Sequence, residues 1–260
     1  MHMCIHEDMK SFRALLLVVA GLALACSRPP VPAPVPVPAG WRLVMSDDFD
    51  RLDTSRWVVS THTFDGNAAR FRVENATVRH GVLTLTVRKH QTEDRKYSAG
   101  ELQSRDSFEY GRFEVRMRAA RGSGVISSFF HYRPSPWQEI DIEFLGRRPS
   151  AVQANLYDSP TAQPVEIAPF PQLHDLAFDA AAEFHVYAIE WEPTEIRWYV
   201  DGTLVDQTRD PASIPHQPLK LALNCWPSTA ESWAGALDDS ALPARAEYDW
   251  IRVYERSANK

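Results

Sequence analysis

The stretch PWQEIDIEFLG carries an acid at every second position, Glu139, Asp141 and Glu143, with apolar residues between them. Side chains two positions apart point to the same face of a β-strand, and the intervening side chains point to the other face. The pattern therefore predicts a strand with one apolar face against a core and one face that carries three acids. Because Asp and Glu are poor strand formers and neighbouring like charges repel, an ordinary solvated face is the less favoured interpretation.

Two of these acids have the chemistry of a glycosidase. A retaining glycosidase needs two carboxyl groups about 5 to 5.5 Å apart, one as the nucleophile and one as the proton donor to the leaving oxygen. The Cα atoms of Glu139 and Glu143 are about 13 Å apart in an extended strand, and their long side chains can lean toward each other. Asp141 lies between them and would influence both protonation states, because three adjacent carboxyl groups do not all ionise cheaply.

Two other kinds of site fit the sequence less well. A calcium ion takes six to eight oxygen ligands, mostly from loops, and the strand holds no His that would suggest zinc. His131 and His185 lack the Cys or Ser pattern of a nucleophilic triad, so we expect both to serve in packing or in hydrogen bonds to a substrate.

The elements that position the acids are predicted to be other short strands. From Trp41 onward the sequence is a succession of alternating runs separated by turn residues: GVLTLTVRK, GRFEVRMRA, GVISSFFHY, EIDIEFLG, FHVYAIEWE, IRWYVDG, LKLALNCW and YDWIRVYE. Such spacing without a long helical period predicts an all-β sandwich. Asp201 and Gly202 favour a tight hairpin turn. With no internal repeat and no second linker, residues 41–257 are expected to form one domain.

The tryptophans divide into two groups. Trp191, Trp198 and Trp250, with Tyr254, lie in alternating patterns that favour core positions. Trp137 directly precedes the acidic residues, and Trp226 lies at a strand end, where a flat ring can face a sugar.

The N-terminus predicts export. Lys10 and Arg13 precede the apolar run ALLLVVAGLALA, which is too short to span a bilayer and has the order of a secretory signal. Residues 1–25 are therefore expected to be a signal peptide, with Met9 as the true start. The sequence ALA before Cys26 fits an ordinary signal-peptidase site, whereas LALAC resembles the lipobox of bacterial lipoproteins.

Lipidation at Cys26 is the favoured alternative, because a free cysteine at a mature N-terminus has no packing role. Residues 26–40 form a Pro-rich linker, extended at about 3 Å per residue, that would hold the domain away from a membrane. The expected location is exported, either a lipoprotein of the cell envelope or a secreted protein.

Net charge and cysteine content limit the binding partners and the disulfides that can be expected. The net charge of −6 gives no indication of nucleic acid as a partner. Of the three cysteines, only Cys225 lies in the expected domain, so no disulfide can form within it. A monomer is expected.

The whole domain resembles glycoside hydrolase family 16. WQEIDIEFLG is similar to the active-site strand of that family, whose signature is E-x-D-x-E, and particularly to that of bacterial β-1,3-1,4-glucanases, the lichenases. SSFFHY, VQANLY, FDAAAEFHVYAIEWEPTEIRWYVDG, LALNCW and AEYDWIRVY match in order. The resemblance implies a concanavalin A-like β-jelly-roll sandwich of two packed antiparallel sheets, a concave cleft for a polysaccharide and retention of configuration, with no cofactor for catalysis.

The resemblance also implies roles for individual residues. Glu139 is similar to the nucleophile, Glu143 to the general acid/base and Asp141 to the carboxylate that assists them. Further residues match substrate-binding positions: Glu101, Phe130, Tyr132, Trp137, Asn155, Tyr157, Asn224 and Trp226. Asp249 is similar to an aspartate that holds a structural calcium ion together with backbone carbonyls, here expected around Gly81; a strand-edge residue satisfied by a hydrogen bond or salt bridge is the alternative.

Several departures leave the substrate open. Gln103 stands where lichenases commonly have Arg, Gln138 where they commonly have Asp, and the cysteines of their disulfide are absent. Residues 158–174 are richer in Pro than the lichenase counterpart and could reshape one end of the cleft. We therefore expect an endo-β-glucanase for mixed 1,3 and 1,4 links, with β-1,3-glucan, xyloglucan or a galactan as alternatives, and a non-catalytic carbohydrate-binding protein as a second alternative.

Overall fold

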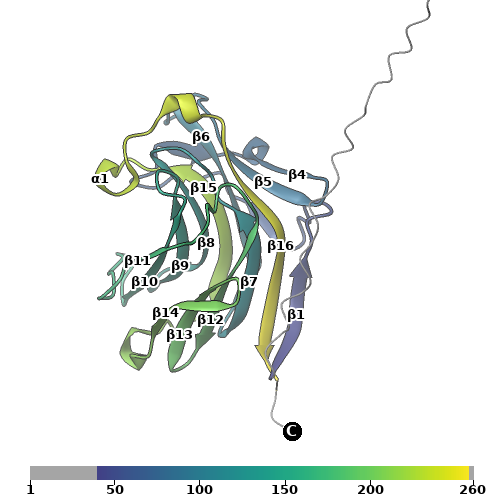
Figure 1. Ribbon diagram of the computed structural model, residues 1–260, viewed down its shortest axis with the longest axis vertical. Helices are drawn as coiled ribbons and strands as arrows, with labels where there is room; N and C mark the ends of the chain where they lie inside the picture. The colour runs from purple at the N-terminus through teal and green to yellow at the C-terminus, as the bar shows by residue number, and fades with distance from the viewer. Residues whose placement is uncertain (1–39, 258–260) are drawn as a thin grey trace, which may run out of the picture.

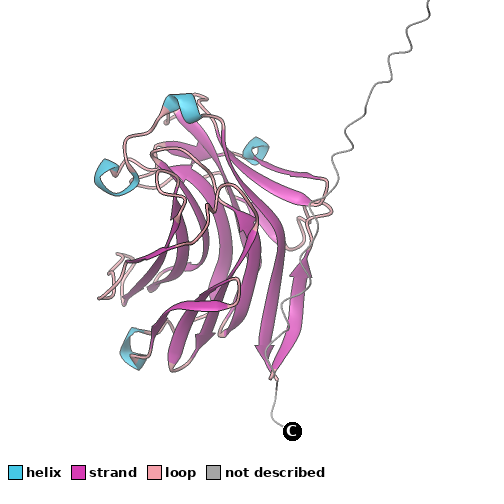
Figure 2. Cartoon of the chain, viewed as in Figure 1, coloured by secondary structure: helices cyan, strands magenta, loops and turns pink. Residues whose placement is uncertain are grey.

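The computed structural model describes residues 40–257, and these residues form two stacked β-sheets of eight strands each (Figures 1 and 2). The predicted signal peptide, Cys26 and nearly all of the predicted linker lie outside the described residues. In the described part of the chain, no helix is both long enough and apolar enough to cross a membrane.

Sheet A has the strand order β14-β13-β12-β7-β16-β5-β4, with β1 also paired to β16. Its strands are β1 (Trp41–Asp47), β4 (Ala76–Arg79), β5 (Val82–Val87), β7 (Gly111–Arg118), β12 (His185–Glu192), β13 (Glu195–Val200), β14 (Thr203–Thr208) and β16 (Ala244–Arg256).

Sheet B has the order β11-β10-β9-β8-β15-β6-β2, and β3 joins it by a parallel pairing with β6. Its strands are β2 (Trp57–Val59), β3 (Ala69–Phe71), β6 (Tyr97–Phe108), β8 (Val125–Pro134), β9 (Trp137–Leu145), β10 (Ala151–Ser159), β11 (Gln172–Asp175) and β15 (Leu219–Pro227). The short helices are η1 (Val73–Asn75), η2 (Pro211–Ser213), α1 (Glu231–Ala234) and η3 (Asp239–Ala241).

The core lies between the sheets and explains the apolar half of the acidic strand. In β9, Ile140, Ile142 and Phe144 are buried in the core, and Phe144 packs its ring 4.8 Å from that of Tyr187 in β12 of sheet A. Full burial of each such side chain contributes about 1.5 to 3 kcal/mol. A shift of β9 by one residue would exchange its two faces, so this burial fixes which face carries the acids.

Two aromatic side chains of sheet A also cross the core to hold sheet B by hydrogen bonds. Trp198 Nε1 donates to the backbone carbonyl of Asp141 at 2.9 Å. The Tyr248 hydroxyl contacts the carbonyl oxygens of Ser128 at 3.0 Å and Asn224 at 2.9 Å. These contacts reach β9, β8 and β15 and therefore hold the centre of sheet B from behind.

All eight strands expected from alternating sequence are present, and Asp201 and Gly202 form the predicted turn with φ angles of 47° and 78°. Trp191 and Trp198 are core residues, as predicted. Trp250 and Tyr254 are buried outside the core instead: Arg252 stacks on Trp250, and the Tyr254 hydroxyl donates to Glu114 Oε2 at 3.2 Å. The core prediction for these two residues is wrong because both faces of β16 carry aromatic residues, and periodicity alone does not show which face is the core.

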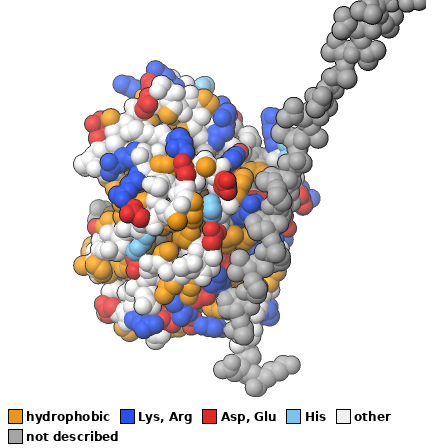
Figure 3. All heavy atoms as spheres, viewed as in Figure 1, with side chains coloured by type: hydrophobic (Ala, Val, Ile, Leu, Met, Phe, Trp, Pro, Cys, Tyr) orange, Lys and Arg blue, Asp and Glu red, His pale blue; other side chains and the backbone are white. Residues whose placement is uncertain are grey.

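Acidic and basic side chains are intermixed on the face of the molecule seen in Figure 3. Ion pairs also join neighbouring strands: Arg42 of β1 and Glu255 of β16 form an exposed pair at 2.9 Å, and Arg112 of β7 and Glu190 of β12 form a buried one at 2.6 Å. The strongly mixed signs explain how this surface carries many charges without one continuous basic or acidic field.

His131 is a polar residue in the aromatic part of the core. It lies on β8, its ring centroid is 4.1 Å from that of Phe113, and neither ring nitrogen has a hydrogen-bond partner in the structure. Burial lowers the pKa of His131 to about 3, because the charged imidazolium would lose its hydration.

We predict that His131 makes the protein less stable in mild acid. The imidazole of His131 binds a proton near pH 6.5 in the unfolded chain but only near pH 3 in the folded chain. The free energy of unfolding is therefore unaffected by this group above pH 6.5 and decreases as the pH falls from 6.5 toward 3. Relative to a His131→Leu variant, the wild type should lose about 2 kcal/mol of unfolding free energy between pH 8 and pH 5.

Denaturant unfolding at several pH values measures this difference. Phe129→Leu, which changes another buried ring on β8, is the matched control and should show a constant offset from the wild type. A pH-independent difference between wild type and His131→Leu would contradict the prediction.

Candidate active site

Strand pairing places the predicted residues on one face of sheet B. Residues directly opposite each other in neighbouring strands share a face. One row across the sheet contains Glu101, Asn224, Ser128, Glu143 and Gln153. The next contains Gln103, Ala222, Phe130, Asp141 and Asn155. A third contains Lys220, Tyr132, Glu139 and Tyr157. We call this the carboxylate face.

Glu139 is held by two donors from its own strand. Trp137 Nε1 donates to Glu139 Oε2 at 2.9 Å, and Asp141 forms a second hydrogen bond to the Glu139 carboxyl group. The pKa of Glu139 is raised to about 7, mainly by burial and to a smaller extent by the charge of Glu101, whereas the two hydrogen bonds oppose the rise. The donors therefore favour the carboxylate form of Glu139.

Asp141 is the most buried of the three acids, with 3% of its surface exposed. Its pKa is raised well above the usual value, first by burial and then by the charges of Glu139 and Glu143. A protonated Asp141 can donate to Glu139, which lets the two groups share one proton instead of opposing two charges.

Glu143 is held by neutral amides from the adjacent strand. Gln153 Nε2 donates to Glu143 Oε2 at 3.0 Å, and Asn155 forms a second bond to the same carboxyl group. Gln153 is itself fixed by Trp233 Nε1, which donates to Gln153 Oε1 at 3.0 Å. The pKa of Glu143 is raised to about 8, first by burial and then by the charge of Glu139, whereas the hydrogen bonds from Gln153 and Asn155 oppose the rise.

Glu101 forms a second carboxylate position on the same face, three strands away from β9. The Ser60 hydroxyl donates to Glu101 Oε1 at 2.7 Å, and Gln103 Nε2 donates to the same oxygen at 2.9 Å. Asn224 Nδ2 is 3.5 Å from Glu101 Oε2, and His62 Nε2 is 3.9 Å from Oε1. Burial raises the pKa of Glu101.

Aromatic rings lie on both sides of the acids. Tyr132 packs edge-on against Trp137 with ring centroids 5.0 Å apart, next to Glu139. Toward the far side, the ring of Trp226 is 5.0 Å from that of Phe64 and 6.2 Å from that of Trp233. Flat apolar rings beside hydrogen-bonding groups are suited to sugar rings, which present apolar faces and polar edges.

Comparison with known proteins agrees with this geometry. The protein-family model for glycosyl hydrolases family 16 matches residues 64–252 of the sequence. The chain belongs to this family.

The relatives and structural neighbours are consistent with the family. A beta-glucanase of Brevibacillus brevis is 36% identical over 215 residues, with 79% of this chain and 80% of that protein covered. A prokaryotic beta-1,3-1,4-glucanase (lichenase) derived from a mouse hindgut metagenome has a TM-score of 0.74 and 34% identity, covering 80% of this chain and 97% of its own. The laminarinase from Rhodothermus marinus has a TM-score of 0.72 and 30% identity, covering 84% and 98%. The predicted jelly-roll sandwich and family are thereby confirmed.

One departure from the family pattern has no contact with the carboxylate face. Gln138 points to the opposite side of β9, where its Nε2 donates to Asp158 Oδ1 at 2.9 Å. Its Oε1 accepts from the backbone amides of His216 and Gln217 at 3.2 and 3.0 Å. Gln138 therefore fastens a neighbouring loop, whereas Gln103 lies on the carboxylate face and changes the groups around Glu101.

Asp249 and Gly81, the residues predicted to hold calcium, lie near each other, but Asp249 forms an ion pair with Arg116. Tyr248 pairs with Leu83, which places Asp249 beside the β4–β5 turn that contains Gly81. Asp249 is fully buried, and its Oδ2 accepts from Arg116 Nη1 at 2.7 Å. Within residues 40–257, no group of three or more His, Cys, Asp and Glu is arranged to hold a metal ion. A calcium ion here would depend on backbone carbonyls, and the site stays a prediction.

The sequence interpretation missed Gln153, Trp233 and Glu166. Gln153 stands two positions before Asn155, so the two-residue period of β10 could have placed it on the carboxylate face. Glu166 had no such signal. It lies in the Pro-rich segment that folds back beside β10, where it forms an isolated bridge with Tyr157 and accepts from the Tyr157 hydroxyl at 3.2 Å.

We predict that the negative charge of Glu166 helps to keep Glu143 protonated. The groups that face Glu143 are Glu139 and Asp141 on β9, Gln153 and Asn155 on β10, and Glu166. Removing one negative charge by Glu166→Gln should lower the pKa of Glu143, because a nearby negative charge disfavours ionisation of the carboxyl group.

Carbon-13 NMR titration of labelled glutamate carboxyl groups measures this pKa, with Glu143→Gln to assign the signal. Glu183→Gln, an exposed residue beside Arg116 and Phe184 on the outer face of sheet A, is the control and should leave the Glu143 titration unchanged. A Glu143 pKa that is equal in wild type and Glu166→Gln would refute the prediction.

Proposed function

We propose that this chain is an endo-β-glucanase that cleaves β-1,3-1,4-glucan with retention of configuration. The observation that supports this most directly is the different environment of two glutamates on one face. Glu139 receives hydrogen bonds from Trp137 and Asp141 that favour its charged form, whereas burial and the negative charge of Glu139 raise the pKa of Glu143 to about 8, so that Glu143 retains its proton. A retaining glycosidase requires one carboxylate and one carboxylic acid in such an arrangement.

In the first step, a carboxylate oxygen of Glu139 attacks the anomeric carbon of the sugar. The bond from that carbon to the glycosidic oxygen breaks as Glu143 transfers its proton to the leaving oxygen. This forms a covalent glycosyl ester on Glu139 and leaves Glu143 ionised. Asp141 donates to Glu139 at rest and can adjust that hydrogen bond as the charge of Glu139 is consumed.

In the second step, ionised Glu143 removes a proton from water, and the water oxygen attacks the anomeric carbon of the ester. The ester bond breaks, Glu139 regains its charge and Glu143 regains its proton. Two inversions at one carbon give a product with the configuration of the substrate.

Internal cleavage follows from binding groups on both sides of the acids. Glu101, Asn224 and Trp226 lie toward β6, and Tyr157 and Glu166 lie toward the opposite edge. Asn224 Oδ1 is buried without a hydrogen-bond partner, and a sugar hydroxyl could donate to it. A polysaccharide that contacts both sides places its scissile bond away from its ends.

Hydrolysis of β-1,3-glucan is a second candidate, supported by Gln103. The neutral side chain donates to Glu101 where lichenases commonly have a charged arginine, so the sugar beside Glu101 meets different groups. The similarity to the Rhodothermus marinus laminarinase agrees with this possibility. A panel of purified polysaccharides with linkage analysis of the products decides between the two substrates.

We predict that Glu139→Gln and Glu143→Gln each reduce hydrolysis of the preferred glucan by about four orders of magnitude or more, because each removes one half of the two-carboxylate mechanism. The measurement is the steady-state rate of hydrolysis, made on variants whose melting temperature equals that of the wild type. Azide should restore turnover to Glu139→Ala with a product of inverted configuration, since the small anion replaces the nucleophile. Wild-type-like rates in either Gln variant would rule out the assignment.

We further propose that the protein is exported and anchored by a lipid on Cys26. The support is the basic and apolar N-terminal sequence followed by LALAC and a Pro-rich linker.

Labelled palmitate should be incorporated into the wild type, and Cys26→Ala should move the protein from the membrane fraction to the soluble fraction. Hydrolytic activity should be unchanged, because the linker separates the anchor from the domain. Equal amounts of soluble wild type and variant, without label, would instead support ordinary signal-peptide cleavage.

A further inference from the structure

The segment of residues 60–68, here called the rim segment, borders the carboxylate face beyond Glu101. It connects β2 to β3 and contributes three side chains to the surroundings of the face. Ser60 donates to Glu101, His62 lies 3.9 Å from the same carboxyl group, and Phe64 packs against Trp226. The position of the rim segment therefore determines what surrounds Glu101 and Trp226.

One side of the rim segment is joined to the end of β15 by backbone contacts. Ala68 N donates to the carbonyl of Pro227 at 2.9 Å, and Thr229 N donates to that of Gly66 at 2.8 Å. Asn67 forms an isolated bridge with Ser228. These bonds fix the second half of the segment relative to β15.

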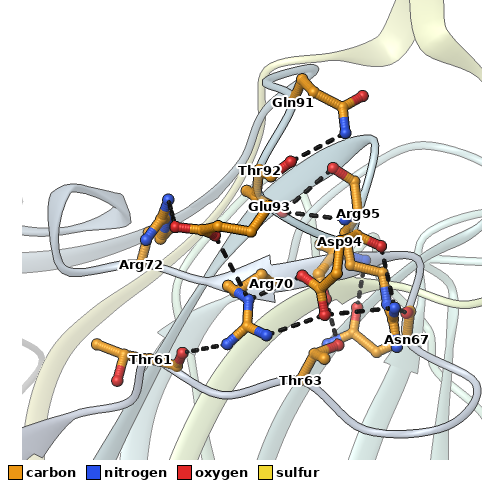
Figure 4. Close-up of polar contacts among 11 residues, drawn as sticks. Thr61, Thr63, Asn67, Arg70, Arg72, Gln91, Thr92, Glu93, Asp94 and Arg95 are labelled. Atoms are coloured by element: carbon orange, nitrogen blue, oxygen red, sulfur yellow. Dashed lines mark hydrogen bonds and ion pairs between the residues drawn. The ribbon is translucent and has the colours of Figure 1, made fainter.

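The other side is held by arginines (Figure 4). Arg70 Nη1 donates to the carbonyl of Thr61 at 2.9 Å, and Arg95 Nε donates to the carbonyl of Asn67 at 3.1 Å. Because the rim segment lies outside the regular strands, the carbonyls of Thr61 and Asn67 are satisfied by these side-chain donors.

Arg70 is itself fixed by the loop between β5 and β6, the loop to which Arg95 belongs. Arg70 makes a bidentate pair with Asp94, with Nε–Oδ1 and Nη2–Oδ2 distances of 2.8 and 2.9 Å. Arg95 Nη1 is 3.5 Å from the same carboxylate, and Arg72 Nη2 donates to Glu93 Oε1 at 2.9 Å. We call Arg70, Arg72, Glu93, Asp94 and Arg95 the ionic latch.

The latch is ionic and partly exposed. The side chains of Arg70 and Asp94 are 27% and 36% exposed, so salt can screen their attraction. The bidentate geometry makes this pair stronger and more directional than a single surface contact. The only cysteine among the described residues is Cys225, which is buried and free, so no disulfide there supplements the latch.

We infer that Arg70, Asp94 and Arg95 are positioning residues that hold the rim segment to bind the sugar units farthest from Glu139. This rests on the proposed function. Glu101 is separated from β9 by three strand spacings, or about 14 Å, so a substrate must span several sugar units to reach the rim segment.

The test compares Arg70→Met, Asp94→Asn and the double variant with the wild type. The KM for polymeric β-glucan should rise about five- to tenfold in each, because the rim segment contributes to binding but not to bond cleavage. The kcat should stay within about twofold, and the KM for short aryl β-glycosides should not change. The double variant should be no worse than the worse single variant, since both remove the same pair.

Calorimetry provides a readout that does not need turnover. In a Glu143→Gln background, Asp94→Asn should raise the Kd for a long gluco-oligosaccharide by the same factor, and Asp94→Glu should restore most of the affinity. Raising NaCl from about 0.05 to about 1 M should weaken binding by the protein that retains Asp94 and have little effect on the Asn variant.

Glu255→Gln is the matched control, because Glu255 forms an exposed pair with Arg42 at 2.9 Å on sheet A. It should change neither KM nor Kd. Unchanged affinity in Arg70→Met and Asp94→Asn, or an equal loss for long and short ligands, would overturn the inference. Absence of glucan hydrolysis by the wild type would instead refute the proposed function, and the Kd ratios would still test the latch.

Discussion

The two-residue period of β9 imposes the main constraint on this molecule, because one strand must satisfy a core on one side and three neighbouring carboxyl groups on the other. The core side requires a second sheet, whose Tyr187 packs against Phe144 of β9 and whose Trp198 donates a hydrogen bond to the backbone carbonyl of Asp141. The acidic side requires shared protons and neutral donors, since burial raises the pKa of all three acids. The sandwich and the site are therefore consequences of the same strand.

The hydrogen-bond donors to the two glutamates come from different strands on the two sides of Asp141. Glu139 is held within its own strand by Trp137 and Asp141, whereas Glu143 is held from β10 by Gln153 and Asn155. The arrangement needs β9 and β10 in register, because Gln153 is directly opposite Glu143. A change of register would remove these amides and with them the hydrogen bonds that orient the Glu143 carboxyl group.

The centre and the edges of sheet B are stabilised in different ways. Hydrogen bonds from Trp198 and Tyr248 hold the central strands through a dry core, where salt has little influence. The edges are held by exposed groups, among them the Arg70–Asp94 pair and the contact between Tyr157 and Glu166. Substitutions at the edges can therefore change the groups that meet a substrate while the carboxyl groups of β9 keep their positions.

The sequence by itself determined the elements whose character is local. The alternation in β9, β12, β13 and β15 gave the strands and their faces, because the side-chain period of a strand is two. The E-x-D-x-E pattern gave the chemistry of Glu139, Asp141 and Glu143, and the resemblance to family 16 gave Glu101. Residues whose role follows from one strand, or from a motif within it, could be predicted in this way.

Only the tertiary structure decided which distant segments meet. Trp233 reaches Gln153 across 80 positions of the chain, Arg70 reaches Asp94 across 24, and Glu166 returns to Tyr157 through an irregular loop. Both faces of β16 carry aromatic residues, so its outer ring, Trp250, could be distinguished from a core ring only once the sheets were stacked. Such contacts depend on loop paths and sheet packing, which the short-range periodicity of a strand does not specify.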